Sequence, residues 1–451
     1  MPLSPFLLRT GTSLFALAVL GVFALLYIFT PGGYFTLLHL LGDSPYPTPF
    51  ADTKTILDAT ACWRAGVDVY TPSACLRGGI FNYSPLLLRL AFFLPAGPAA
   101  TLAGGLASVA AFILSLSLLP PPETPRALAI RCAAATSIAT IFGVERGNFD
   151  LVIFCLVVLG VALTLRHSAL RLAGYLFFLL AAGLKFYPAA ALVLLAKEPR
   201  RPLLLFALPL ALLGTAYILG FHHGTISALK TLPGGPPFIY WFGAINLPYG
   251  LSLLLHAPAS LLTQNFALYQ LALANLHVPA PIALAIQLPL WTAAALAMLF
   301  LSQRRAPAPA LDPAARAFHI TGAALTLCCF FAAQNVVYRE IFLLLTLPAL
   351  ERDNQTPWLL PAILFLLWEE TLRPIAAIAS ATLLPIPLAN ATQITFWLLR
   401  ELLWWATITQ LGATLVEYGQ AEARRLLGGA FKQGRPGALP LDPAKGSPLE
   451  P

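Results

Sequence analysis

Apolar segments close to 20 residues long recur along almost the whole 451-residue chain. A segment of that length can form a helix that crosses a hydrocarbon core about 30 Å thick. Only 10% of the residues are charged, whereas soluble domains carry about 25%, so the chain cannot cover a globule with polar surface. Backbone groups in lipid must pair within helices or closed barrels, and the sequence lacks the short alternating strands of a barrel. The sequence therefore predicts an all-α, polytopic transmembrane helical bundle.

The apolar segments differ in length, and several are shorter than a full span. The clearest are residues 14–29, 99–119, 127–142, 151–165, 172–196, 203–219, 282–301, 318–333, 341–350, 359–368 and 396–415. Short or broken helices at membrane depth are tolerated where they line protein or a cavity. We expect about 10 to 13 spans. The first is expected to be retained rather than cleaved as a signal peptide, because no small-residue cleavage site precedes Pro31.

The chain divides into one membrane domain, residues 1–431, and a tail, residues 432–451. The tail is rich in proline, glycine and charge, which predicts a disordered cytoplasmic end. No repeat of the solenoid type is present.

The basic residues gather in short clusters between the apolar segments, which is typical of cytoplasmic loops. The net charge of +8 therefore indicates membrane topology and not a nucleic-acid partner. The predicted cytoplasmic positions are Arg126, Arg131, Arg166, Arg171 and residues 197–201, 304–316 and 424–432. The opposite face then receives Asp52 and residues 145–150, 185–188, 222–249 and 334–339. We expect the functional face of this protein to be the extracytoplasmic side of the inner (plasma) membrane.

The first large loop, residues 52–94, begins with the carboxylate of Asp52 just outside the membrane. The pattern from Asp52 to Gly66 predicts a short amphipathic helix along the membrane surface. A solvated linker with ordinary surface charge is the alternative. Cys62 and Cys75 lie on this loop and can pair if it faces an oxidising compartment.

Three further polar groups stand out against the apolar background. The segment GVERGNFD, residues 143–150, carries Glu145 and Asn148 and forms either the polar edge of a cleft or a connection whose charges pair internally. Lys185 lies alone in an apolar run, at a cost of about 2.5–3.5 kcal/mol on insertion scales. It therefore faces a cavity or an anion, unless it snorkels to the surface. Arg339, beside Glu340, offers the fixed donors that bind phosphate, or it pairs with its neighbour.

No spacing of histidine, cysteine and carboxylate residues predicts a metal site, and we expect no cofactor. The partners expected are membrane lipids and a lipid-linked substrate. No oligomeric state follows from the sequence.

Several of these segments occur in a familiar order. Asp52, then GVDVY ending at Tyr70, then FNYSP around Tyr83 resembles the D-x-x-x-Y…A-G-x-D-x-Y…F-x-Y-P-P pattern of glycosyltransferase family 87. ERGN, residues 145–148, resembles its G-Q-x-N, and LKFYP, residues 184–188, resembles its L-K-x-x-P. The resemblance covers about residues 10–200, and the second half is similar only in hydropathy.

The resemblance implies the GT-C fold, with a large extracytoplasmic first loop, and inverting transfer of a sugar such as mannose from polyprenyl phosphate to a lipid or glycan acceptor. Asp52 would be the catalytic base. The implied donor- and substrate-binding residues are Tyr83, Glu145, Asn148, Lys185, Tyr338 and Arg339, with Lys185 and Arg339 on the phosphate.

The sequence departs from the family pattern in three places. Ser84 replaces the first proline of the Pro-Pro pair, and Arg146 with Gly147 replaces Gly-Gln. Tyr338 and Arg339 stand where a histidine is common. These departures bear on which sugar donor and which acceptor the protein would use.

Two other classes of protein share these features. A transporter or lipid flippase also uses broken helices and buried charges, and a membrane scaffold would use the loop charges only for topology. An enzyme requires Asp52, Lys185 and Arg339 to converge on one site, whereas separate surfaces would argue against one.

Overall fold

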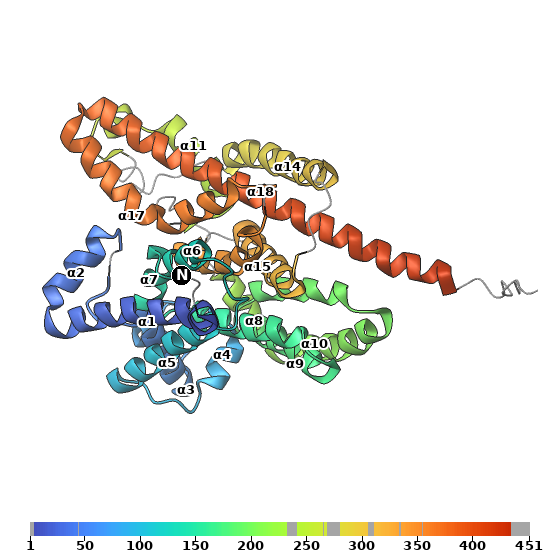
Figure 1. Cartoon of the computed structure of the whole chain (residues 1–451). Coiled ribbons are helices and arrows are strands. Elements are labelled where there is room, and N and C mark those ends of the chain that lie inside the picture. Colours follow the sequence, from blue (N-terminus) through green and yellow to red (C-terminus); the bar gives the residue numbers. More distant parts are fainter. Residues whose placement is uncertain are drawn as a thin grey trace, which may run out of the picture.

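The computed structural model describes residues 4–43, 45–231, 241–264, 266–267, 280–304, 311–332, 335–353 and 355–433. Figure 1 shows a protein built almost entirely from helices, which confirms the predicted helical class. Within the described residues the strands are β1 (Trp241–Phe242) and β2 (Asn335–Val336), which pair antiparallel with Trp241 opposite Val336. Of the predicted tail, residues 432–433 still belong to the last helix, and residues 434–451 lie outside the described residues.

Five helices in the described part of the chain are long and apolar enough to cross a membrane. They are α1 (Pro5–Phe29), α5 (Pro98–Leu116), α10 (Arg200–Lys230), α14 (Ala280–Arg304) and α15 (Pro313–Ala332). A sixth span is possible if α6 (Pro125–Ala135) and α7 (Ile138–Glu145), bent by 42°, are counted together. This is fewer than the 10 to 13 expected.

The remaining apolar helices are not among these five for two physical reasons. The helices α8 (Asp150–Thr164) and α9 (Ser168–Leu184) are too short. The helices α17 (Leu359–Leu383) and α18 (Ile386–Gln433) are long but carry charges along their apolar parts. The other elements are α2 (Pro31–Leu40), α3 (Ala51–Arg64), η1 (Ala74–Leu76), α4 (Pro85–Leu90), η2 (Tyr187–Lys197), α11 (Asn246–His256), α12 (Ala259–Leu262), η3 (Val337–Leu345) and α16 (Leu347–Leu350).

The helix α3 is the amphipathic helix predicted for the first loop. Ile56 and Leu57 are buried on one face, while Lys54 and Asp58 form an ion pair on the other. The start of α3 is fixed by Phe50, whose left-handed backbone (φ 61°) precedes the first turn.

A close contact with α5 holds this start in place. A Cβ atom at Gly105 of α5 would lie 2.2 Å from the Phe50 ring, so only glycine permits the contact. The backbone N–H groups of Phe50 and Asp52 donate to the carbonyls of Glu145 and Arg146, at 2.8 and 2.9 Å. Asp52 is therefore attached to the end of α7.

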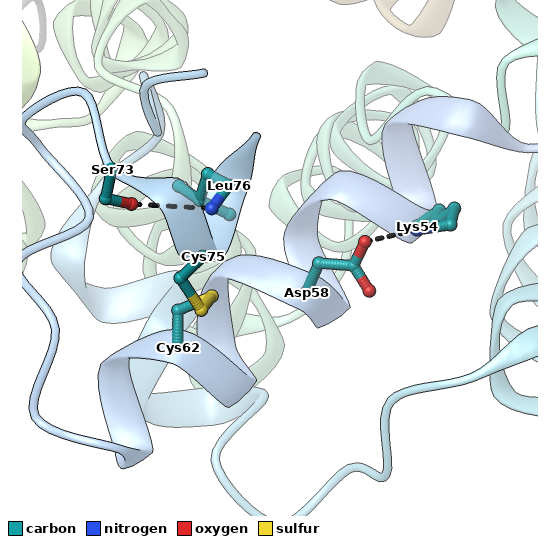
Figure 2. The surroundings of a disulfide bond; sticks show 6 residues. All are labelled: Lys54, Asp58, Cys62, Ser73, Cys75 and Leu76. Atoms are coloured by element: carbon teal, nitrogen blue, oxygen red, sulfur yellow. Dashed lines mark hydrogen bonds and ion pairs between the residues drawn. A yellow bond between two sulfur atoms is a disulfide. The ribbon is translucent and has the colours of Figure 1, made fainter. Parts of the chain in front are cut away.

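A disulfide between Cys62 and Cys75 ties the last turn of α3 to η1, with the two Cα atoms 6.0 Å apart (Figure 2). Cys62 and Cys75, which the sequence showed only as able to pair, are therefore bonded to each other. The remaining cysteines, Cys132, Cys155, Cys328 and Cys329, are free.

Two helix boundaries near the site lie at or close to prolines, Pro85 and Pro188. The helix α4 begins at Pro85, and the Ser84 hydroxyl caps it by accepting from the Leu86 N–H at 3.1 Å. The Ser84 hydroxyl also contacts the Tyr217 hydroxyl of α10 at 2.9 Å. The helix α9 stops before Lys185, whose backbone is extended (φ −142°, ψ 132°), and η2 begins beyond it. This break turns the Lys185 side chain inward.

The polar groups lie at opposite ends of α8. Asp150, at its first residue, pairs with Lys185, while the Thr164 carbonyl at its last residue accepts from Lys197 at 3.0 Å. Fifteen residues of helix separate the two ends by about 21 Å. Arg171, near the start of α9, pairs with Glu198 at the Lys197 end. Lys197 and Arg171 thus lie at the end of α8 that is away from Asp150 and Lys185.

A second cluster of charges lies buried between α17 and α18, where the sequence predicted only apolar segments. Arg400 pairs with Glu369 at 2.7 Å and with Glu401 at 3.0 Å, and all three side chains are excluded from solvent. The Arg400 guanidinium also donates to the Trp241 carbonyl at 2.8 Å. The outer faces of both helices remain apolar, with exposed residues that include Ile375, Ile378, Leu399 and Leu402.

Candidate functional site

The site is organised around Asp150, which opens α8 and is buried. Its Oδ1 atom lies 2.7 Å from Lys185 Nζ and accepts from the Tyr187 hydroxyl at 2.8 Å. Its Oδ2 atom accepts from Arg339 Nε at 3.2 Å. One carboxylate therefore joins α8, the break after α9 and η3. Lys185 faces an anion, as one of the alternatives predicted, and does not snorkel to the surface.

Asn148 links this centre to the first loop. Its side-chain Nδ2 donates to Asp52 Oδ2 at 2.5 Å, and its Oδ1 accepts from the Asp150 N–H at 2.8 Å. Lys185 Nζ lies 3.5 Å from the same Oδ1 atom. Asn148 is fully buried, and its amide is held by the Asp52 carboxylate on one side and by the Asp150 N–H and the Lys185 ammonium on the other.

Asp52 is the partly open end of the network, with 19% of its side chain exposed. Burial raises the pKa of Asp52, and the Arg146 cation and the Asn148 hydrogen bond oppose that rise only in part. Arg146 Nη1 lies 3.9 Å from Asp52 Oδ1. A carboxylate with a raised pKa that stays accessible has the properties of a general base.

Arg146 is a site residue that the sequence analysis treated only as a departure from a family pattern. Its guanidinium lies 4.4 Å from the centroid of the Phe142 ring and 4.8 Å from that of Tyr46. Such contacts with aromatic faces stabilise a cation without neutralising it. The spacing of Phe142, in α7, and Arg146, its C-cap residue, was the available signal.

The other predicted site residues, Tyr83, Glu145 and Tyr338, contact three different groups. The Tyr83 ring lies 4.8 Å from Lys185 Nζ, and burial raises the pKa of Tyr83 well above its usual value. Tyr338 packs its ring on Phe142, with centroids 5.8 Å apart. The Glu145 carboxylate is not hydrogen-bonded to this network in the described residues. Its Oε1 accepts from the Tyr46 N–H at 3.1 Å.

The structure therefore brings Asp52, Asn148, Lys185 and Arg339 into one network, with Tyr83 beside it. Asp150 and Tyr187, which complete the network, were not among the predicted site residues. The charges of GVERGNFD pair mainly with distant segments, so internal pairing is not what holds this connection.

The charges of the site do not cancel. Three basic side chains, those of Arg146, Lys185 and Arg339, face two acidic ones, those of Asp52 and Asp150, which leaves one positive charge. Arg146 and Arg339 are 21% and 18% exposed, whereas Lys185 is only 7% exposed. The partly exposed groups of the site are thus one carboxylate, Asp52, and two guanidinium groups, a combination that suits a phosphate next to a hydroxyl that loses its proton.

Within the described ranges, no group of three or more His, Cys, Asp or Glu side chains has an arrangement that would hold a metal ion. A cavity of about 220 Å³ lies beside the network and shares Arg146 with it.

No model of a known protein family matches this chain. A search of curated protein sequences likewise finds no match.

Proposed function

We propose that this protein is an integral membrane glycosyltransferase that moves a sugar from polyprenyl phosphate to a hydroxyl of a lipid or glycan acceptor. The proposal includes membership of glycosyltransferase family 87 with the GT-C fold, and mannose is the first sugar to test. The observation that carries it is the network in which Asp52 lies next to Arg146 and is linked through Asn148 and Asp150 to Arg339.

In the proposed reaction, Asp52 takes the proton of the acceptor hydroxyl while that oxygen attacks the anomeric carbon. The new bond joins the acceptor oxygen to the anomeric carbon, and the bond from that carbon to the phosphate oxygen breaks. Polyprenyl phosphate leaves with the electron pair, and the anomeric configuration inverts. Catalysis then consists mainly of positioning and of stabilising charge.

The guanidinium groups of Arg146 and Arg339 are the proposed partners of the leaving phosphate. Lys185, which the sequence analysis assigned to the phosphate, pairs with Asp150 at 2.7 Å and is buried. We therefore assign Lys185 a positioning role, in which it and Asp150 hold Arg339 and Asn148 in place.

The proposed location of the reaction is the extracytoplasmic face of the plasma membrane. Disulfides form and persist in oxidising compartments, and the loop with the Cys62–Cys75 bond carries Asp52. The basic cluster at the opposite end of α8 suits the cytoplasmic side.

The test uses purified protein in liposomes with labelled polyprenyl-phosphate sugars, mannose first. Asp52→Asn should lower the rate of transfer about 10²–10⁴-fold, which is the usual contribution of a general base. Asp58→Asn is the matched control, since Asp58 lies on the same helix but its partner Lys54 belongs to the exposed face.

Near-normal transfer by Asp52→Asn would contradict the assignment of Asp52 as the catalytic base. If the wild-type protein transfers none of the sugars but moves the labelled lipid across the bilayer, the protein is a flippase and not an enzyme.

A further inference from the structure

We infer that the cavity beside Arg146 is a binding site for a single neutral sugar ring. This inference rests on the proposed function and deepens it, because it separates the place of the sugar from the place of the phosphate.

The walls of the cavity come from distant parts of the chain. Phe142 and Arg146 face it from α7, Trp241 from β1, Val336 from β2, Asp43 from the loop after α2 and Glu370 from α17. Trp241 and Val336 are opposite each other in the short β1–β2 pairing, so this sheet builds one wall. The volume of about 220 Å³ is below the roughly 300–1,000 Å³ of sites for drug-sized ligands. One monosaccharide ring is a ligand of suitable size.

The polar side of the cavity favours a ligand with hydroxyl groups. Glu370 is buried, and its Oε2 pairs with Arg373 at 2.5 Å. Its Oε1 atom has no hydrogen-bond partner among the described residues. A buried acceptor without a donor is costly, and a sugar hydroxyl would supply that donor. Asp43, also buried, adds a second carboxylate to the wall.

The wall carries two carboxylates, Asp43 and Glu370, against one cation, Arg146, and this balance argues against a phosphate inside the cavity because like charges repel. The rings of Phe142 and Trp241 provide apolar surface for the C–H groups of a sugar. A pyranose has both kinds of surface, hydroxyl groups around its rim and C–H groups on its faces.

Arg146 joins the cavity to the reaction centre. Its side chain lines the cavity, and its Nη1 atom lies 3.9 Å from Asp52 Oδ1. A sugar in the cavity is therefore next to the proposed base, while the phosphate lies on the side of Arg339. The sugar is either that of the donor or the terminal sugar of the acceptor.

The experiment measures binding of methyl α-mannopyranoside, methyl α-glucopyranoside and methyl α-galactopyranoside to the full chain in detergent by saturation-transfer NMR. The wild-type protein should bind at least one of them. Glu370→Gln should weaken that binding about tenfold or more, the effect of losing one hydrogen bond to a charged group. Val336→Phe, which fills the cavity, should abolish it.

Two controls keep the result interpretable. Asp58→Asn should still bind the glycoside, since Asp58 is outside the wall of the cavity and pairs with Lys54 on the exposed face of α3. Glu123→Gln, at an exposed carboxylate, should bind like the wild type. Size-exclusion profiles of Glu370→Gln and Val336→Phe should match the wild type, and Glu370→Gln keeps the shape of the side chain.

The inference is overturned if no glycoside binds the wild type, or if binding survives in both Glu370→Gln and Val336→Phe. Sugar transfer by the wild type with unchanged binding in these variants would refute the inference alone. Binding in the cavity without any transfer would refute the proposed function alone.

Competition then identifies the source of the sugar. A donor sugar is indicated if the polyprenyl-phosphate sugar displaces the methyl glycoside and polyprenyl phosphate does not. An acceptor sugar is indicated if the glycoside stays bound in the presence of the polyprenyl-phosphate sugar.

Discussion

Replacing Asp150 by asparagine should destabilise the protein far more than a charge change on its surface. Among the described residues, Asp150 is the carboxylate that pairs with both Lys185 and Arg339, at 2.7 and 3.2 Å. Asparagine keeps the shape and can still accept from the Tyr187 hydroxyl, but it carries no negative charge. Two buried or half-buried cations then remain near each other, and breaking a buried pair in this way costs about 3–5 kcal/mol.

The matched control is Asp58→Asn, which removes a carboxylate that is 37% exposed and paired with Lys54. Exposed pairs contribute about 0.2–1 kcal/mol. The free energy of unfolding is measured by titrating SDS into mixed micelles and following near-UV circular dichroism. We expect the loss for Asp150→Asn to exceed that for Asp58→Asn by at least about 2 kcal/mol.

A double mutant tests the cause of the loss. Adding Lys185→Met to Asp150→Asn removes one of the two cations that are left without an anion. The two substitutions should therefore show a coupling energy of about 0.5–3 kcal/mol in the stabilising direction. If Asp150→Asn and Asp58→Asn unfold at the same SDS fraction, the ion pairs of Asp150 do not stabilise the fold as argued.

Three further results are expected. Alanine at both Cys62 and Cys75 should lower the free energy of unfolding by about 3 kcal/mol; dithiothreitol should cause a similar loss in the wild type and none in this variant. Transfer should decline as the pH falls through the raised pKa of Asp52, above the usual value of about 3.9, because only the carboxylate is a base. The Asp52 contribution to stability should rise as the pH falls through that window, because the folded state binds the proton more tightly. Transfer that stays constant down to about pH 4 would contradict the role of Asp52.

Local features of the fold were predictable because their causes lie within a few residues. The amphipathic pattern after Asp52 predicts α3, and Pro188 predicts the break at Lys185. An isolated lysine in an apolar run was expected to face a cavity or an anion unless it snorkelled, and it pairs with Asp150. In each case the sequence limits the local structure to a few alternatives, and the structure selects one of them.

The partners of these groups were not predictable in the same way. Asp150 follows Asn148 in a polar connection, and nothing in that segment indicates that its carboxylate binds Arg339, which is 189 positions away. Arg400 and Glu369 were missed because Arg400 lies inside, and Glu369 directly after, a segment that is otherwise apolar. The predicted number of spans remains a prediction, because five helices of the described residues are long and apolar enough to cross a membrane and the shorter or charged ones are not decided by length and composition.

The charges shared by α17 and α18 constrain the order in which this protein is assembled in the cell. A charge at the centre of a helix opposes entry into lipid by about 2.5–3.5 kcal/mol, and α17 carries Glu369, Glu370 and Arg373. Arg400, the partner of Glu369, is synthesised later, on the helix that follows after a two-residue connection. We therefore expect α17 to wait beside the insertion machinery until α18 emerges, so that the two helices enter the bilayer together as a hairpin.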